Sequence, residues 1–280
     1  MDRRTFIAGT VAASVTTRIS WAAADHKIEK IGLELYTVRD LLKKDFEGTL
    51  AKVAKIGYKE VEFAQYFEHL SELNPLPKKA RQILDGDGLT APATHVAYTA
   101  LSPENWPKVI DACKVLGMDY IVNPSIDRDL AKTADGWKRA AETFNRAGEE
   151  SQKAGIQLGY HNHTEEFKAV DGQLPYDILL SECDPNLLKM EIDLGWVHEA
   201  GADPLVYFEK YPGRFPLVHV KDFDKNGMMT DVGSGVIDWA KILSKSDVAG
   251  IKHYFVEHDN PMLPFETIQK SYTYLEKLRF

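Results

Sequence analysis

The segment IQLGYHNH, residues 156–163, combines a short run of strand-forming residues with a polar end that holds two histidines. Successive side chains of a β-strand point to opposite faces, so Leu158 and Tyr160 share one direction while His161 and His163 share the other. Strands of a buried parallel sheet are mostly apolar, and their carboxyl ends carry the polar groups of a site. The segment therefore predicts a buried strand whose last residues face a polar pocket.

Seven further segments have a similar form, and helix-like segments lie between them. The eight predicted strands are KIGLELY (30–36), YKEVEF (58–63), TAPATHV (90–96), DYIVNP (119–124), IQLGYHNH (156–163), LLKMEIDL (187–194), FPLVHVKD (215–222) and KHYFVEHD (252–259). Several helix candidates, such as FEGTLAKVAKIG (46–57) and NWPKVIDACKVLG (105–117), end in glycine, which suits a helix C-cap. Eight strands alternating with helices predict an α/β fold, a single-domain (β/α)₈ TIM barrel. An open doubly wound sheet is the alternative, but no Gly-x-Gly-x-x-Gly motif follows the first strand.

The first 24 residues, MDRRTFIAGTVAASVTTRISWAAA, have the form of a targeting segment. Adjacent Arg3 and Arg4 precede a short apolar stretch and a small-residue end, an order that resembles the twin-arginine export signal. We expect residues 1–24 to be a signal peptide and residues 25–280 to form the barrel domain. The mature protein would then be periplasmic or secreted, with no membrane insertion after signal removal. An amphipathic first helix is the alternative.

Composition excludes several classes of function. The chain of 280 residues has a formal charge of −8, with 44% hydrophobic and 27% charged residues, which is an ordinary globular composition. Nonspecific nucleic-acid binding depends on clustered cations, and the sequence holds no long run of lysine or arginine. We therefore expect no nucleic-acid partner.

Polar residues lie at the ends of the last four predicted strands, where alternation gives them a common direction. If that direction is the barrel axis, His161, Asp193, His219 and Glu257 converge at one level. The opposite facing would place charged groups in the apolar layer under the helices, which is costly. Two imidazoles and two carboxylates form a site for one divalent metal ion. We expect Mn²⁺ first, while Zn²⁺, Co²⁺, Fe²⁺ and Mg²⁺ remain alternatives.

Further polar or aromatic residues near strand ends are candidate substrate-binding residues. Glu62 and His95 end the second and third strands, where they either bind substrate hydroxyls or orient the metal ligands from behind. Glu166 follows the fifth strand. Trp196 follows the sixth strand and would form an apolar wall for a sugar ring, although aromatic residues there are also common core residues.

The chain resembles the sugar phosphate isomerase/epimerase group of the xylose isomerase-like barrel superfamily. The resemblance rests on IGLELYTVRD (31–40), GYHNHTEEF (159–167), EIDLGWVHEAGADP (191–204), YPGRFPLVHVKD (211–222) and VEHD (256–259). It implies a divalent ion held by the His161 neighbourhood, Asp193, His219 and Glu257. Many epimerases of the superfamily carry a glutamate on strand five, where this chain has histidines. The strand-five ligand is therefore His161, His163 or Glu166, and one carboxylate of the usual acid–base pair is missing.

Such a site suits removal of a proton from a carbon next to a carbonyl, through an ene-diolate. His163 and Glu257 are the candidate bases, and Lys221 would help to neutralise the developing negative charge. We expect a sugar isomerase or epimerase acting on an unphosphorylated sugar. The alternative is an exported lyase that eliminates a β-substituent from a 3-keto-glycoside. Metal-dependent endonucleases share the barrel, but the acidic charge disfavours one, and a non-catalytic sugar-binding barrel is the remaining class.

The partner is therefore expected to be a small sugar or glycoside. The C-terminal segment PMLPFETIQKSYTYLEKLRF (261–280) is an amphipathic helix candidate. It either covers the barrel or contacts a second copy, so a homo-oligomer is one outcome.

Overall fold

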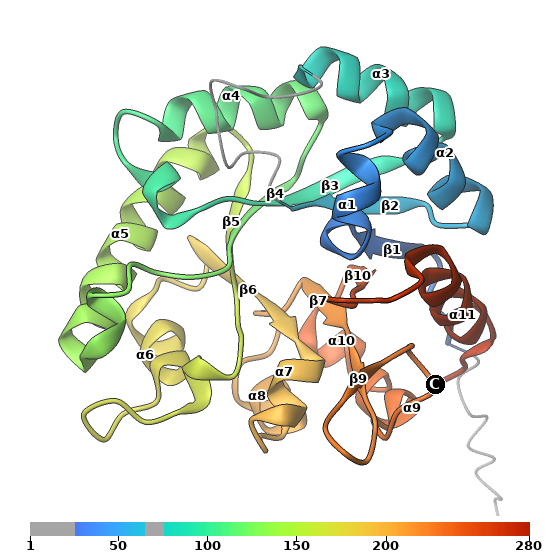
Figure 1. Ribbon diagram of the computed structural model, residues 1–280. Helices are drawn as coiled ribbons and strands as arrows, with labels where there is room; N and C mark the ends of the chain where they lie inside the picture. The colour runs from blue at the N-terminus through green and yellow to red at the C-terminus, as the bar shows by residue number, and fades with distance from the viewer. Residues whose placement is uncertain (1–25, 65–75) are drawn as a thin grey trace, which may run out of the picture.

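Eight parallel strands close into a barrel in the computed structural model, which describes residues 26–64 and 76–280 (Figure 1). Strand β10 pairs with both β1 and β7, and this pairing closes the barrel. The strands are β1 (Ile31–Glu34), β2 (Glu60–Phe63), β3 (Thr90–His95), β4 (Tyr120–Asn123), β5 (Gln157–His161), β6 (Leu188–Asp193), β7 (Leu217–Val220) and β10 (His253–Val256). Each lies inside one of the segments predicted from the sequence, so the predicted (β/α)₈ barrel is confirmed.

Helices follow the strands and form the outer layer (Figure 1). They are α1 (Arg39–Leu42), α2 (Phe46–Ile56), α3 (Pro77–Asp87), α4 (Trp106–Leu116), α5 (Ala134–Lys153), α6 (Pro175–Glu182), α7 (Leu194–Glu199), α8 (Pro204–Lys210), α9 (Trp239–Leu243), α10 (Ser246–Ala249) and α11 (Pro264–Lys277). The C-terminal helix α11 packs against α2, β1 and β10, so it covers the barrel as one of the two predicted outcomes. A short antiparallel pair, β8 (Asp222–Phe223) and β9 (Met229–Thr230), was not predicted because each strand has only two residues.

Short local signals set the ends of the helices. The side chain of Asp45 accepts a hydrogen bond from the Gly48 N–H at 2.9 Å, which caps α2. Such a cap satisfies an N–H group that has no partner within the helix. At the other end, Gly117 follows α4 with φ of 73°, a left-handed conformation that favours glycine. Helix ends of this kind were predictable from the sequence.

The barrel interior has an apolar floor below its polar carboxyl end. The floor is a cluster of five inward-facing side chains from four strands, namely Ala93, Tyr120, Val122, Leu217 and Phe255. Phe255 is fully buried, and a Cβ placed on Gly32 would lie 2.4 Å from its ring. Only a glycine at position 32 therefore leaves room for the phenylalanine that fills the centre of the floor.

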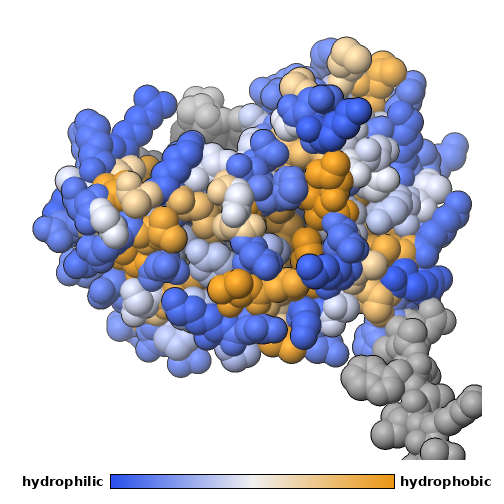
Figure 2. Space-filling view, turned by 90° about the horizontal axis from the view of Figure 1, so that it is seen from below, coloured by the Kyte–Doolittle hydropathy of each residue, from blue (hydrophilic) through white to orange (hydrophobic). Residues whose placement is uncertain are grey.

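The outer surface is mainly hydrophilic. Figure 2 shows one face, on which hydrophobic side chains lie between hydrophilic ones. No described helix is long and apolar enough to cross a bilayer. The predicted signal peptide, residues 1–24, lies outside the described residues, so export stays a prediction.

The floor yields a stability prediction. Replacing Phe255 with Ala removes a fully buried ring and leaves a cavity, so we expect the free energy of unfolding to fall by about 3–5 kcal/mol. Urea denaturation followed by circular dichroism measures this change. Val206, which is 58% exposed on α8, is the matched control, and Val206→Ala should change the free energy by less than about 0.5 kcal/mol. Equal effects of the two substitutions would contradict the assignment of Phe255 to the core.

Candidate active site

A pocket of about 310 Å³ opens where the strands end at the carboxyl face of the barrel. Its volume lies near the lower end of the range for small-molecule sites, about 300–1,000 Å³. The ionisable or hydroxyl-bearing side chains among its lining residues are Tyr36, His95, Ser125, His161, His163, Lys221, Glu257 and Asp259. Carboxyl ends of barrel strands are where enzymes of this fold carry their chemistry, so this pocket is the candidate active site.

The four residues predicted as metal ligands lie together beside this pocket. One potential ligand atom each from His161, Asp193, His219 and Glu257 lies within 4.8 Å of all the others. The strand register explains the convergence, because Asp193 and His219 are direct neighbours across β6 and β7, and His219 is paired with Phe255, two residues before Glu257. Nitrogen and oxygen donors in this number suit a divalent transition metal or Mg²⁺.

Negative charge is concentrated in the same place. Five buried carboxylates, here called the carboxylate cluster, point into the carboxyl end of the barrel: Glu34, Glu62, Glu191, Asp193 and Glu257. Oε1 of Glu191 is buried and has no hydrogen-bond partner in the described residues, while the Glu34 and Glu62 side chains are hydrogen-bonded to each other. Buried carboxylates without donors are costly, so the donor set fits a bound cation.

Lys221 is the buried cation of the cluster and is 1% exposed. Its ammonium lies 3.0 Å from Oδ2 of Asp193, 2.9 Å from Oε2 of Glu257 and 2.8 Å from Oδ1 of Asp259. Burial alone would lower the pKa of Lys221, but these three carboxylates outweigh burial and raise the pKa. Lys221 is therefore protonated, and an ion held by Asp193 and Glu257 would share these carboxylates with it.

Glu62 lies behind a candidate ligand. Its Oε2 is 2.8 Å from Nε2 of His219, while Nδ1 of His219 is 2.8 Å from Oε2 of Glu257. Glu62 does not line the pocket, so of its two predicted roles the geometry fits orientation of His219 rather than contact with a substrate. His95 lines the pocket and contacts Oε2 of Glu191 at 2.7 Å, which leaves both of its predicted roles open.

Glu191 was not singled out from the sequence. It is paired in register with His161, and its Oε2 lies 3.4 Å from Nδ1 of that histidine and 3.3 Å from Nε2 of His219. His95, His161, Glu191 and His219 form a second group of possible metal-ligating atoms. The signal was available, because Glu191 shares the inward direction of Asp193 two residues later.

His163 lies in the pocket as a candidate base. Its ring is 4.9 Å from that of His161, and no hydrogen bond to its ring nitrogens occurs in the described part of the chain. Burial, and then the charge of Lys221, lower the pKa of His163 to about 4. The imidazole is therefore neutral near pH 7 and able to accept a proton.

Glu166 and Trp196 lie elsewhere than expected. Glu166 is buried, with Oε1 accepting from the Tyr160 hydroxyl at 2.6 Å and Oε2 accepting from the His163 N–H at 2.7 Å. Both carboxylate oxygens of Glu166 thus hold the loop after β5. Neither Glu166 nor Trp196 is among the residues that line the pocket. The ring of Trp196 packs on the Lys221 ammonium at 4.5 Å and faces Phe223. The contact of Glu166 and Trp196 with a substrate stays a prediction.

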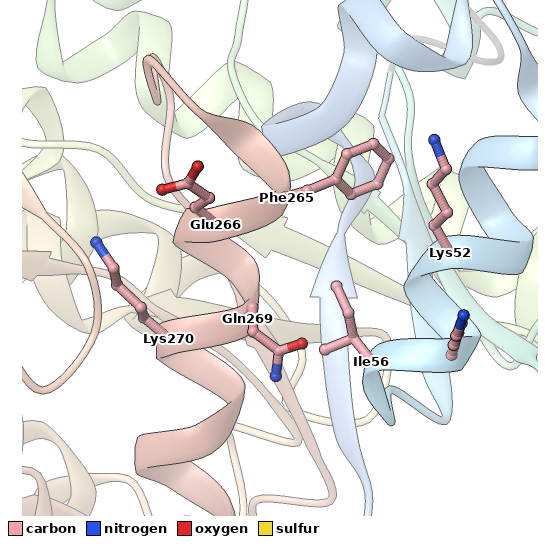
Figure 3. A pocket seen from close by; sticks show the side chains of 7 residues that line it. Lys52, Ile56, Phe265, Glu266, Gln269 and Lys270 are labelled. Atoms are coloured by element: carbon pink, nitrogen blue, oxygen red, sulfur yellow. The ribbon is translucent and has the colours of Figure 1, made fainter.

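A larger pocket of about 610 Å³ lies outside the barrel, between α2 and α11 (Figure 3). Lysines and an aromatic ring line it, including Lys52, Lys270 and Phe265. Glu266 is its single carboxylate, and no histidine lines it among the described residues. Size alone does not make it the reactive site, because the groups that could bind a metal or move a proton lie at the carboxyl end of the barrel.

The closed parallel barrel and its polar carboxyl end define the class of (β/α)₈-barrel proteins with a candidate metal site. The chain belongs to the xylose isomerase-like TIM barrel family, whose model matches residues 50–277. A sugar phosphate isomerase/epimerase from Parabacteroides distasonis is 31% identical, with a TM-score of 0.79 over 94% of this chain and 98% of that chain. The predicted family resemblance is therefore confirmed.

Other relatives differ in their described activity. An inosose dehydratase from Lacticaseibacillus casei is 29% identical over 166 residues, which are 51% of this chain and 55% of that protein. The chain thus spans about half the length of the curated relatives it matches. The IolI protein, solved with a bound zinc atom, is 17% identical with a TM-score of 0.65 over 87% of this chain and 95% of that chain, and it shows the fold alone.

The Glu62–His219 contact yields a prediction about metal affinity. Replacing Glu62 with Ala removes the nearer of two carboxylates beside Nε2 of His219, at 2.8 Å, and leaves Glu191 at 3.3 Å, so we expect the Kd for Mn²⁺ to rise about 10–100-fold. Isothermal titration of metal-free protein measures it. Glu60→Ala is the matched control, because Glu60 lies on the same strand but pairs with His253 at the other end of the barrel. If both variants bind Mn²⁺ as the parent does, Glu62 does not orient a ligand.

Proposed function

We propose that the protein is a divalent-metal-dependent enzyme that removes a proton from a carbon next to the carbonyl of a sugar. One observation carries the proposal: the carboxylate cluster converges with His161 and His219 beside a pocket that also holds the neutral imidazole of His163. His161, Asp193, His219 and Glu257 would hold the ion. The ion, when bound, supplies positive charge that stabilises the oxyanion developing at the carbonyl.

The side chains of the pocket have separate tasks in this reaction. His163 accepts the proton, because its imidazole is neutral and faces the pocket. Lys221, fixed by three carboxylates, adds positive charge beside the same space. Glu257 lines the pocket and is the second candidate base, although the burial that would raise its pKa is outweighed by Lys221 and His219, which lower it. The lowered pKa makes Glu257 the weaker base.

Elimination is the outcome that this arrangement favours. A single base that takes a proton and returns it to a departing hydroxyl on the same face suffices for elimination, whereas inversion of a carbon centre requires a second group on the opposite face. The strand-five carboxylate that would serve as that second group is replaced here by His161. The similarity to inosose dehydratases supports the same outcome. We therefore infer a carbon–oxygen lyase, which was the second choice from the sequence.

Isomerisation remains the second candidate, supported by the sugar phosphate isomerase/epimerase that matches nearly the whole chain.

In either case we infer an unphosphorylated substrate. Among the described residues that line the pocket, Lys221 is the one lysine or arginine, and three carboxylates already surround it. A phosphate ester would meet excess negative charge there. Export by the twin-arginine route, if it occurs, would fit such a substrate.

The reaction is tested with metal-loaded protein in D₂O, offered inosose, 3-keto-glycosides and unphosphorylated ketoses in turn. Release of water or of an aglycone supports the lyase. Deuterium at the carbon next to the carbonyl without elimination supports isomerisation. Absence of both exchange and elimination with every substrate, in protein that holds its ion, contradicts the proposal.

The role of His163 yields a prediction of its own. His163→Gln removes the base but none of the four proposed ligands, so we expect kcat to fall about 10²–10⁴-fold while the metal content stays the same. Steady-state kinetics and metal analysis measure the two quantities. His198→Gln is the control, because His198 is exposed on α7. A His163 variant with parental kcat rules out this base.

A further inference from the structure

Tyr36 is an aromatic residue of the pocket wall to which no role has yet been given. It lies in the 3₁₀ helix η1 (Leu35–Val38), directly after β1. Among the described residues that line the pocket, it is the one tyrosine, tryptophan or phenylalanine. The apolar wall expected from Trp196 is therefore present, but Tyr36 provides it.

Three contacts hold Tyr36 in place. Its N–H donates to Oε1 of Glu34 at 3.0 Å, and its carbonyl accepts from Nη1 of Arg39 at 2.8 Å. The guanidinium carbon of Arg39 lies 3.9 Å from the centre of the Tyr36 ring. Because Arg39 covers one face of this ring, the pocket can meet only the other face or the edge.

Arg39 also connects the loop after β1 with the loop after β10. Its Nη1 donates to the Asp259 carbonyl at 2.6 Å, and its Nη2 donates to Oδ1 of Asn260 at 3.0 Å. The His258 N–H donates to Oγ1 of Thr37 at 3.0 Å in the same region. Two loops distant in sequence are thus joined, and the ring of Tyr36 is held rigidly before a substrate arrives.

The polar side chains elsewhere in the pocket wall indicate which part of a ligand the Tyr36 ring contacts. The polar groups of the pocket include His161, His163, Lys221 and Glu257, which suit the hydroxyl and carbonyl oxygens of a sugar. A cyclic sugar or cyclitol also has an apolar face formed by its C–H groups, and aromatic rings supply apolar area at low entropic cost. Tyr36 is the residue placed to receive that face.

We propose that Tyr36, held by Arg39, is the binding residue for the C–H face of a neutral ring-shaped polyhydroxy ketone. Tyr36 determines specificity for a ring, and Arg39 is a positioning residue that acts through it. The proposal rests on the proposed function, because it takes a sugar as the ligand. It adds which side of the pocket recognises the ring and explains the close contact between the two loops.

The test uses the full-length, metal-loaded protein with inosose as the probe. Tyr36→Leu removes the aromatic face, so we expect KM and Kd for inosose to rise about tenfold while kcat changes less than about threefold. Tyr36→Phe keeps the ring and should restore most of the affinity lost in Tyr36→Leu. Tyr211→Leu is the matched control, because Tyr211 also carries a cation near its ring, Lys210 at 5.0 Å, but does not line the pocket.

A double-variant cycle tests the part assigned to Arg39. Arg39→Met should raise KM, and adding it to Tyr36→Leu should raise KM no further, because the two residues act on one contact. Additive effects would show that Arg39 does not act through Tyr36. Metal content and melting temperature are measured for each variant. If KM rises only in variants that lose the ion or unfold, the result counts against the proposal.

Failure of this proposal differs from failure of the proposed function. If Tyr36→Leu has the KM and Kd of the parent protein, Tyr36 does not contact the substrate. Turnover of inosose by the parent protein would still support the proposed function in that case. Binding of inosose that depends on Tyr36, without turnover, supports the contact and contradicts the function. No binding and no turnover of inosose by the parent protein contradicts the Tyr36 proposal, and the D₂O experiment with the other sugars then decides the function separately.

Discussion

The site depends on one electrostatic constraint, the removal of five carboxylates from water beside a single buried lysine. Each uncompensated buried charge is costly, so bound protons and the neighbouring imidazoles compensate part of the charge, and the proposed cation would compensate a further part. Burial raises the pKa of Glu34 to about 7 and, together with its acidic neighbours, raises that of Glu62 well above its usual range. Burial acts on Glu191 in the same direction, but the nearby imidazoles, His219 first, outweigh it and lower the pKa. The imidazoles thus favour the charged form of Glu191, whereas the pKa of Glu62 is raised although Glu62 also contacts His219.

The barrel can tolerate the carboxylate cluster because its interior is divided along the barrel axis into an apolar floor and a polar layer. The apolar floor around Phe255 separates the carboxylate cluster from the Glu60–His253 pair at the other end of the barrel. Side chains alternate between the two faces of a strand, so Leu217 of the floor and His219 of the site both face the barrel interior on β7. Asp193 joins site and fold more directly, because its Oδ1 accepts from the Trp196 N–H at 2.8 Å and caps α7 while its Oδ2 faces Lys221.

The sequence predicted the positions of those site residues that lie on strands, because side chains alternate along a strand with a period of two residues. His161, Asp193 and His219 end strands, so alternation placed them on the inner side and the order of strands brought them together. Residues beyond the strand ends follow no period, and their positions were not predicted: Glu166 accepts hydrogen bonds from its own loop, and the Trp196 ring packs on Lys221. Their positions depend on tertiary contacts that no local pattern encodes.

The charges around the pocket also bear on the proposal that the substrate is an unphosphorylated sugar. The three carboxylates around the Lys221 ammonium would repel a further anion, and Arg39, which lies over the Tyr36 ring, donates to two carbonyl oxygens and an amide oxygen of its own chain. Three of the five N–H donors of Arg39 are thus used within the chain, which leaves fewer donors for a phosphate. In our proposal the same bonds make Arg39 a rigid support for the contact between Tyr36 and a neutral ring.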